Sequence, residues 1–131
     1  MLLIDSSVWI DFLRGAGSPE TALLDAHLAG RKPVATTGII LQEVLQGAKS
    51  ERDFNLLEAR LSALQYLPAS KRTHVEAAAL LRKSRTKGVT VPTTDALIAA
   101  VAVEHMAGLL TADHAHFRAL ARISKLQLVI P

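Results

Sequence analysis

The sequence contains no cysteine in 131 residues. Disulfide bonds, thiolate zinc sites and a cysteine nucleophile are therefore excluded. A lack of cysteine fits a reducing compartment, so we expect a cytoplasmic protein. The apolar run at the N-terminus stops at Asp5 and has no basic leader, so it does not predict a signal peptide.

Aromatic residues and long apolar runs are also scarce. The chain has Trp 1, Tyr 1 and Phe 3, so its core must consist mostly of Leu, Ile, Val and Ala. The longest uncharged apolar run, residues 96–103, is far shorter than the ~18 residues of a membrane span. Because 50% of the residues are hydrophobic, the sequence predicts one globular domain, residues 1–131, with no membrane association.

The excess of positive charge is small. Lys and Arg number 15 against 12 Asp and Glu, giving a formal net charge of +3. This balance permits a polyanionic partner such as a nucleic acid but does not require one. The basic run at residues 82–87 falls late in a predicted helix, where cations favour the negative helix end. We interpret it as a solvated face, with RNA contact as the alternative.

The first thirteen residues carry the most informative pattern. Residues 2–4 form a short apolar run that is typical of a buried strand in a parallel sheet. Asp5 ends this run, and Ser6 or Ser7 is expected to cap the helix that follows. An acidic residue therefore stands where a strand ends and a helix begins, at the edge where α/β sheets bind ligands.

Short apolar strands alternate with helices in the rest of the chain. Further strands are predicted at residues 33–36, 65–68, 109–111 and 126–130. The alternation indicates an α/β fold with a small, mainly parallel sheet flanked by helices on both faces. Residues 96–103 are apolar on all sides, which predicts a helix in the middle of the fold.

Helix starts are predicted where a residue can cap the first turn. Such residues are Ser18 (followed by Pro19), Thr37, Ser50, Ser70 and Thr94. The helix after Ser70 is expected to bury an apolar face made of Val75, Ala78, Ala79 and Leu81.

Four acidic residues are distinguished by their positions. Asp5 and Asp113 follow apolar strands, Asp95 opens the buried helix, and Glu43 lies within an apolar helix. Each alone has a structural explanation as a turn residue, a favourable charge at a helix start, or a solvated residue. Because a parallel sheet gathers its strand ends along one edge, we expect the four carboxyl groups to share one pocket.

Carboxylates gathered in this way repel one another, by ~3 kcal/mol for a pair ~5 Å apart at an effective dielectric of ~20. A divalent cation, or protonation of some of the acids, relieves the repulsion. Oxygen ligands without His or Cys select Mg²⁺ or Mn²⁺, and such a cation can activate water and stabilise charge on a phosphoryl group. We expect Asp5 and Asp95 to be the primary metal ligands, with Glu43 and Asp113 completing the site through metal-bound water.

Three segments of the chain resemble one known family. The opening LLIDSSVWIDFL, the later TTDALIAAVA and the near-terminal LLTADHAHF are similar to PIN-domain ribonucleases, most of all to the VapC toxins of toxin–antitoxin pairs. The resemblance spans nearly the whole chain. It aligns the acids of the family with Asp5, Glu43, Asp95 and Asp113, and its first hydroxyl residue with Ser6.

This resemblance implies an Mg²⁺- or Mn²⁺-dependent endoribonuclease that cleaves single-stranded or looped RNA and acts as the toxin of a VapBC-type pair. It further implies a homodimer and a cognate small antitoxin, through which alone the protein contacts DNA. In the family, apolar surface near the early helices receives the antitoxin, although Trp9 and Phe12 are expected to lie in the core. Asn at position 5 or 95 is expected to abolish RNA cleavage without lowering the stability of the metal-free protein.

Other readings of the sequence compete with this one. A housekeeping PIN-domain RNA-processing nuclease and a catalytically inactive PIN-like module that binds RNA or protein are the alternatives. A dehalogenase-type phosphatase is disfavoured because Ser7 stands where it needs a second Asp, and a receiver domain is disfavoured because its acidic pair is absent. His114 and His116 depart from the family pattern and suggest, with Asp113, a minor zinc alternative. The remaining histidines are interpreted as surface residues: His27, His74 and His105.

Overall fold

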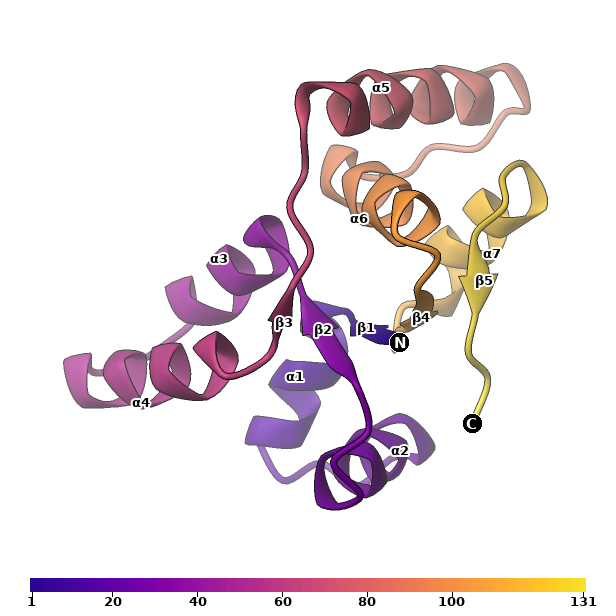
Figure 1. Cartoon of the computed structure of the whole chain (residues 1–131). Coiled ribbons are helices and arrows are strands. Elements are labelled where there is room, and N and C mark those ends of the chain that lie inside the picture. The colour runs from indigo at the N-terminus through magenta and orange to yellow at the C-terminus, as the bar shows by residue number, and fades with distance from the viewer.

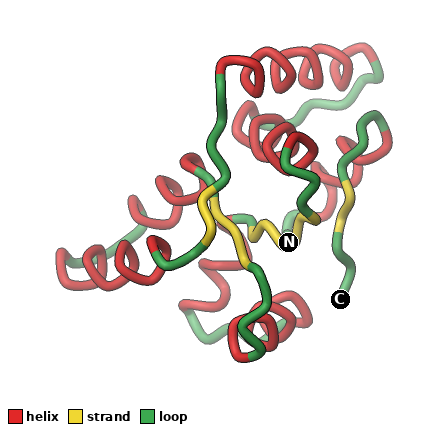
Figure 2. Tube along the Cα trace, viewed as in Figure 1, coloured by secondary structure: helices red, strands yellow, loops and turns green.

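A five-stranded sheet with the order β3-β2-β1-β4-β5 runs through the centre of the protein, and every neighbouring pair is parallel. The structure is a computed structural model that describes residues 1–131. The strands are β1 (Leu2–Ile4), β2 (Val34–Thr36), β3 (Gln65–Tyr66), β4 (Gly108–Leu110) and β5 (Gln127–Leu128). Each predicted strand is present, β1 with the predicted ends and the other four with one or both ends shifted by one or two residues, which confirms the parallel α/β fold (Figure 2).

Helices cover both faces of this sheet (Figure 1). They are α1 (Ser6–Leu13), α2 (Pro19–Ala29), α3 (Gly38–Gln46), α4 (Glu51–Ser62), α5 (Lys71–Thr86), α6 (Thr93–Glu104) and α7 (His114–Arg122). The first four helices pack on one side, and α5, α6 and α7 pack together on the other. No helix has the length and apolar character that a bilayer crossing requires.

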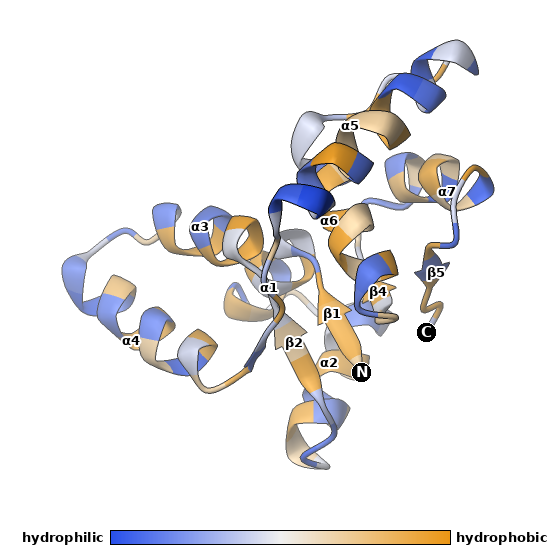
Figure 3. Cartoon of the chain, turned by 45° about the horizontal axis from the view of Figure 1, so that its top comes forward, coloured by the Kyte–Doolittle hydropathy of each residue, from blue (hydrophilic) through white to orange (hydrophobic).

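The core is aliphatic, as the scarcity of aromatic residues predicts. Central strand β1 is buried along its whole length, and the apolar colouring of β1 and β2 is visible in Figure 3. Helix α6 buries most of its residues, including Ile98, Ala99 and Val101, which confirms its expected position in the middle of the fold. The buried strand β1 therefore directly precedes Asp5, and Asp95 lies in the first turn of the buried helix α6.

Two helix starts differ from the prediction. Asp5, rather than Ser6 or Ser7, caps α1, because its Oδ1 accepts a hydrogen bond of 2.9 Å from the Ser6 backbone N–H. Helix α6 begins at Thr93 with Pro92 as its N-cap, so Thr94 lies inside the first turn. Proline suits a helix start because its missing N–H would have no partner there.

The buried face of α5 also differs from the prediction. It consists of Thr73, Ala77 and Ser84, whereas Val75 is 50% exposed. Both hydroxyl groups have acceptors: Thr73 donates to the Glu104 carboxylate of α6, and Ser84 Oγ donates to the Leu81 backbone carbonyl 2.7 Å away. Small residues on this face allow α5 and α6 to pack closely, which an apolar-spacing argument does not anticipate.

Candidate functional site

Pairing of β1 with β4 places two of the predicted acids at the same edge of the sheet. Ile4 is in register with Leu110, so the chain leaves both strands at the same level. The Asp5 N–H donates to the Leu110 carbonyl at 2.9 Å, which holds the two strand ends together. Asp5 and Asp113 therefore both lie at the carboxyl edge of the sheet, as expected from the sequence.

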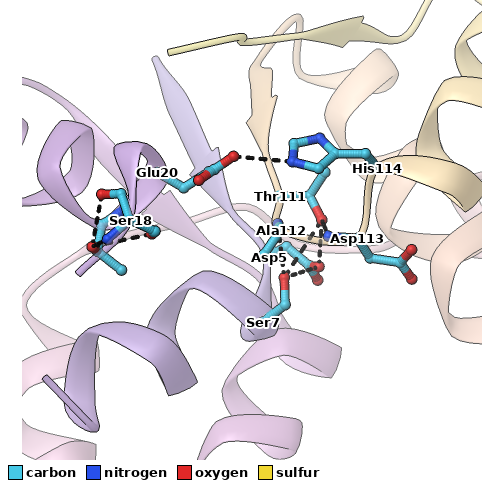
Figure 4. Close-up of polar contacts among 9 residues, drawn as sticks. Asp5, Ser7, Ser18, Glu20, Thr111, Ala112, Asp113 and His114 are labelled. Carbon is cyan, nitrogen blue, oxygen red and sulfur yellow. Dashed lines mark hydrogen bonds and ion pairs between the residues drawn. The ribbon is translucent and has the colours of Figure 1, made fainter. Parts of the chain in front are cut away.

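Asp5 is surrounded by hydrogen-bond donors. Its side chain is buried with a 5% exposed fraction for the residue. Oδ1 accepts from the Ser6 N–H at 2.9 Å. Oδ2 accepts from Ser7 Oγ and Thr111 Oγ1, each at 2.8 Å (Figure 4). Ser7 Oγ also accepts the Ala112 N–H at 3.1 Å, so the network ties the β1–α1 turn to the β4–α7 turn. These donors offset the cost of burying the carboxylate charge.

Asp95 and Asp113 meet at the imidazole of His116. His116 Nδ1 lies 3.1 Å from Asp95 Oδ2 and 2.9 Å from Asp113 Oδ2. One ligand atom from each of the three side chains falls within 4.8 Å of the others. Asp95 comes from the first turn of α6, Asp113 is the N-cap of α7, and His116 lies in the first turn of α7. The Asp113 N–H donates to Thr111 Oγ1 at 2.9 Å, which connects this group to the Asp5 network.

Glu43 approaches the same edge from α3. Its Oε1 accepts a hydrogen bond of 3.3 Å from Ser6 Oγ, the hydroxyl that directly follows Asp5. The side chain is half-buried rather than solvated on an outer face. The structure thus connects the four predicted acids through hydrogen bonds to three intervening residues, Ser6, Thr111 and His116.

Charge repulsion within this group is visible in two pKa values. The pKa of Asp95 rises to about 6 because of its burial, the charge of Asp5 and that of Asp113, with His116 opposing the rise. Burial and the charge of Asp5 also raise the pKa of Glu43, while the Ser6 hydrogen bond opposes this. The Asp5 charge therefore acts on acids from both α3 and α6.

The donor set fits a divalent cation. Arg72–Glu76 is the one ion pair that involves a Lys or Arg, so no such cation neutralises the four acids. Carboxylate oxygens from several elements, converging without a protein cation, suit a hard or borderline divalent ion such as Mg²⁺ or Mn²⁺.

Comparison with known proteins supports the same reading of the chain. The family model described as "PIN domain" matches residues 2–123. The chain belongs to the PIN-domain family. It is 36% identical to Ribonuclease VapC11 of Mycobacterium tuberculosis over 132 residues, covering 97% of this chain and 96% of the relative. It is 32% identical to Ribonuclease VapC19 of the same species over 118 residues, covering 89% and 92%.

Solved structures share the fold of this PIN domain. VapBC2 from Rickettsia felis, bound to a DNA fragment from its promoter, matches with a TM-score of 0.79 and 23% identity over 98% of this chain and 96% of the other. VapC20 from Mycobacterium tuberculosis, described as a sarcin–ricin loop cleaving toxin, matches with a TM-score of 0.69 and 20% identity over 91% and 95%. At these identities the likeness concerns the fold.

The histidines of this PIN domain are arranged differently from the minor zinc alternative. His114 Nε2 lies 3.0 Å from Glu20 Oε1 of α2, away from the acid group, so the predicted set of Asp113, His114 and His116 is wrong (Figure 4). Asp95 takes the place of His114 in the group that forms. The spacing of Asp113 and His116 at i and i+3 on a helix is the sequence signal for their contact. The connection to Asp95 arises only in the fold.

The remaining histidines stay outside this group. His27 and His105 contact the backbone carbonyls of Leu23 and Pro68, and His74 is exposed. His116 is therefore the histidine that the fold brings to the acids.

This PIN domain also has an apolar groove among its first four helices. The groove has a volume of about 380 Å³, and 9 of its 10 lining residues are hydrophobic. Trp9, Phe12 and Leu13 of α1 line it opposite Leu57 and Leu61 of α4. The Trp9 ring is buried, which confirms its predicted place in the core, but its Nε1–H has no hydrogen-bond partner. Phe12 is only partly buried against the core.

Proposed function

We propose that this chain is an Mg²⁺- or Mn²⁺-dependent endoribonuclease and the toxin component of a VapBC-type toxin–antitoxin pair. The observation that carries the proposal is the gathering of Asp5, Glu43, Asp95 and Asp113 at one sheet edge, in a chain 36% identical to Ribonuclease VapC11. No Lys or Arg neutralises the four acids, so their mutual repulsion destabilises the fold unless a cation binds between them.

The metal ligands that we propose are Asp5, Glu43, Asp95 and Asp113. When bound, the cation supplies positive charge that activates an attacking water and stabilises a developing charge on the phosphodiester. Asp5 keeps a lone pair on Oδ1 beyond the one used by the Ser6 N–H, and its other contacts fix its orientation. Asp95 projects from the rigid first turn of α6.

Glu43 is the residue that we assign to proton transfer. Burial and the charge of Asp5 raise its pKa, which makes it a stronger base toward the attacking water than an ordinary carboxylate. The hydrogen bond from Ser6 Oγ holds one of its oxygens and leaves the other available to accept that proton. Asp113 completes the site from the opposite side, at the start of α7.

RNA, single-stranded or in a loop, is the substrate class that we propose. The basic residues favour a polyanion, since the net charge is +3 and Arg72 is the one Lys or Arg that pairs with a carboxylate. An unpaired strand can bend its backbone into the acidic edge of the sheet, whereas a stacked duplex cannot. The loop-cleaving activity named for VapC20 supports a looped target for this chain as well.

A cognate small antitoxin is the protein partner that we propose. Matching structures include complexes described as VapBC and as a toxin–antitoxin complex. The apolar groove between α1 and α4 is the surface that we assign to an apolar antitoxin segment, and a basic side chain of that segment would reach the four acids. We also propose a cytoplasmic homodimer that contacts DNA only through the antitoxin.

Neither alternative function gains support from a feature of the molecule. An inactive binding module would have no need of four uncompensated acids, and a housekeeping nuclease would have no need of an apolar groove that a partner can fill. Growth assays distinguish a toxin from both alternatives. Only a toxin should arrest growth, and co-expression of the protein encoded beside it should relieve that arrest.

Single-turnover cleavage of a panel of structured RNAs tests the proposal directly. We expect cleavage with Mg²⁺ or Mn²⁺, none with EDTA, and none from Asp95→Asn under any condition. Co-expression with the protein encoded beside it should restore growth and yield a co-purified complex. Cleavage that persists in EDTA, or an Asp95→Asn variant as active as the wild type, would contradict the metal-dependent mechanism.

A further inference from the structure

We propose that His116 is a nitrogen ligand of the divalent cation in this site, and that the site consequently prefers Mn²⁺ to Mg²⁺. The proposal rests on the metal-dependent function proposed above and adds to it a residue that the acid pattern alone does not include.

The spacing of the three side chains supports this assignment. His116 Nδ1 is 3.1 Å from Asp95 Oδ2 and 2.9 Å from Asp113 Oδ2. Neighbouring ligands of an octahedral ion with bonds of about 2.1 Å lie about 3.0 Å apart, from the geometry of a right angle. The nitrogen is therefore already at this distance from both oxygens, and one ligand atom of each of the three residues lies within 4.8 Å of the others.

The hydrogen-bond chemistry of the group points the same way. Nδ1 of a neutral or protonated imidazole carries at most one hydrogen, which it can share between two carboxylate oxygens but cannot give fully to both. Both oxygens also lack any other donor from the protein. A cation would satisfy the two oxygens and the ring nitrogen together, with the nitrogen deprotonated.

The ring is also free to act as a ligand. His116 Nε2 makes no hydrogen bond within the protein, so no contact commits the imidazole to a structural role on another element. The side chain has an exposed fraction of 39%, which leaves room for water and substrate next to the cation.

Nitrogen ligation changes which metal the site favours. Mg²⁺ strongly prefers oxygen ligands, whereas imidazole nitrogen raises affinity for first-row transition ions relative to Mg²⁺. Asp at position 116 would replace the nitrogen by oxygen and keep a ligand in place. His116→Asp therefore tests whether the ligand atom must be nitrogen, because the variant still offers an oxygen ligand at this position.

His114 provides a matched control. It lies two residues from His116 on the same helix, but its Nε2 contacts Glu20 instead of the acid group. His114→Asn should leave the cation unaffected if only His116 is a ligand. Both variants are first compared with the wild type by circular dichroism and thermal melting, so that unfolded protein is excluded from the comparison.

Electron spin-echo modulation on the full-length protein loaded with Mn²⁺ tests the proposal. We expect nitrogen coupling to Mn²⁺ in the wild type and in His114→Asn, and none in His116→Asp. Isothermal titration should show that His116→Asp lowers the ratio of the Mn²⁺ to the Mg²⁺ binding constant at least about tenfold, because the added carboxylate attracts both cations whereas the nitrogen favours Mn²⁺.

Two results would overturn the assignment. Bound Mn²⁺ without nitrogen coupling in the wild type would mean that His116 only positions the two acids, and coupling that persists in His116→Asp would mean that another residue supplies the nitrogen. RNA cleavage is measured on the same samples. Cleavage by a wild type without nitrogen coupling would refute the ligand and keep the nuclease, whereas coupling without cleavage would keep the ligand and refute the nuclease.

Discussion

Asp5 and Asp95 are both predicted metal ligands, but their surroundings differ sharply. Asp5 receives hydrogen bonds from a backbone N–H and two hydroxyl groups, contributed by Ser6, Ser7 and Thr111. Asp95 has one side-chain contact, with His116, and its pKa rises to about 6. Hydrogen bonds within the protein compensate the charge of Asp5, whereas His116 is the one side chain that hydrogen-bonds Asp95. The two sides of the site therefore differ in how far the fold itself compensates a buried carboxylate.

The largest effect is expected on the rate of RNA cleavage, which substitution of Asp5 or of Asp95 should lower to a similar extent. Asp5→Asn and Asp95→Asn should each lower the rate of metal-dependent RNA cleavage at least about 100-fold, comparable to the removal of one preorganised charge-stabilising group. Single-turnover assays with saturating Mn²⁺ measure this, with Asp25→Asn on the exposed surface of α2 as the control. Full cleavage by either variant would remove that residue from the proposed site.

The second effect, on stability, should have opposite signs on the two sides. Asp5→Asn replaces one carboxylate oxygen by an NH2 group, so at least one of the three donors loses its acceptor, and it should lower the free energy of unfolding by about 1–3 kcal/mol. Asp95→Asn relieves repulsion and should raise it in metal-free protein. Urea denaturation in EDTA at neutral pH measures both values, and Thr111→Val reports the loss of one donor alone. If both variants changed the free energy of unfolding in the same direction, the surroundings of Asp5 and Asp95 would not differ in the way described.

Addition of Mn²⁺ sharpens this comparison. Wild-type protein should gain stability by mass action, and both Asn variants should gain less. From the sequence alone, relief of repulsion predicts no loss of stability for either variant. The donors around Asp5 reverse that expectation for Asp5→Asn.

A third, smaller effect concerns pH in the absence of metal. The pKa of Asp95 is about 6 in the folded protein against an ordinary value of 3.8, so the folded state holds this proton more tightly. The free energy of unfolding should therefore fall as pH rises from about 4 to about 6, and become level above that window. Asp95→Asn should lack this component of the profile. Melting temperatures of the wild type and Asp95→Asn in EDTA test this prediction. A wild-type melting temperature that rises relative to that of the variant over this pH window would contradict it.

The smallest effect is expected outside the acid group, at the contact between His114 and Glu20. Glu20→Gln or His114→Asn should lower the free energy of unfolding by at most about 1 kcal/mol, because the pair is partly exposed. Cleavage should be unchanged, since neither side chain contacts the acids. A loss of cleavage as large as that of Asp5→Asn would show that the site extends to α2.

Much of this molecule follows from local sequence patterns. Strand ends at Asp5 and Asp113 lie at one sheet edge because apolar runs precede both and the sheet is parallel. Asp95 follows from its place at the start of an apolar helix. Glu43 depends on the family resemblance, because nothing in its own helix separates it from a surface acid.

What the sequence does not predict are contacts between distant polar groups. Thr111 reads as the end of a strand, yet its hydroxyl donates to Asp5 across 106 positions. His116 reads as a surface residue near Asp113, and its contact with Asp95 requires the packing of α6 against α7. On α5, Thr73 and Ser84 occupy buried positions because their hydroxyl groups find acceptors, Glu104 of α6 and the Leu81 carbonyl, which no hydropathy pattern encodes.

The central position of β1 has a consequence for the order in which the protein is made. β1 is the first strand to leave the ribosome, but its neighbour β4 begins only at Gly108. A nascent chain that stops before this point has neither Thr111 to orient Asp5 nor Asp113 to face Asp95. Parallel pairing of strands so far apart in sequence also makes late folding steps slow. The proposed nuclease site therefore cannot assemble until the β4–α7 segment has been made, whereas every residue that lines the apolar groove lies between Trp9 and Leu64 and is made earlier.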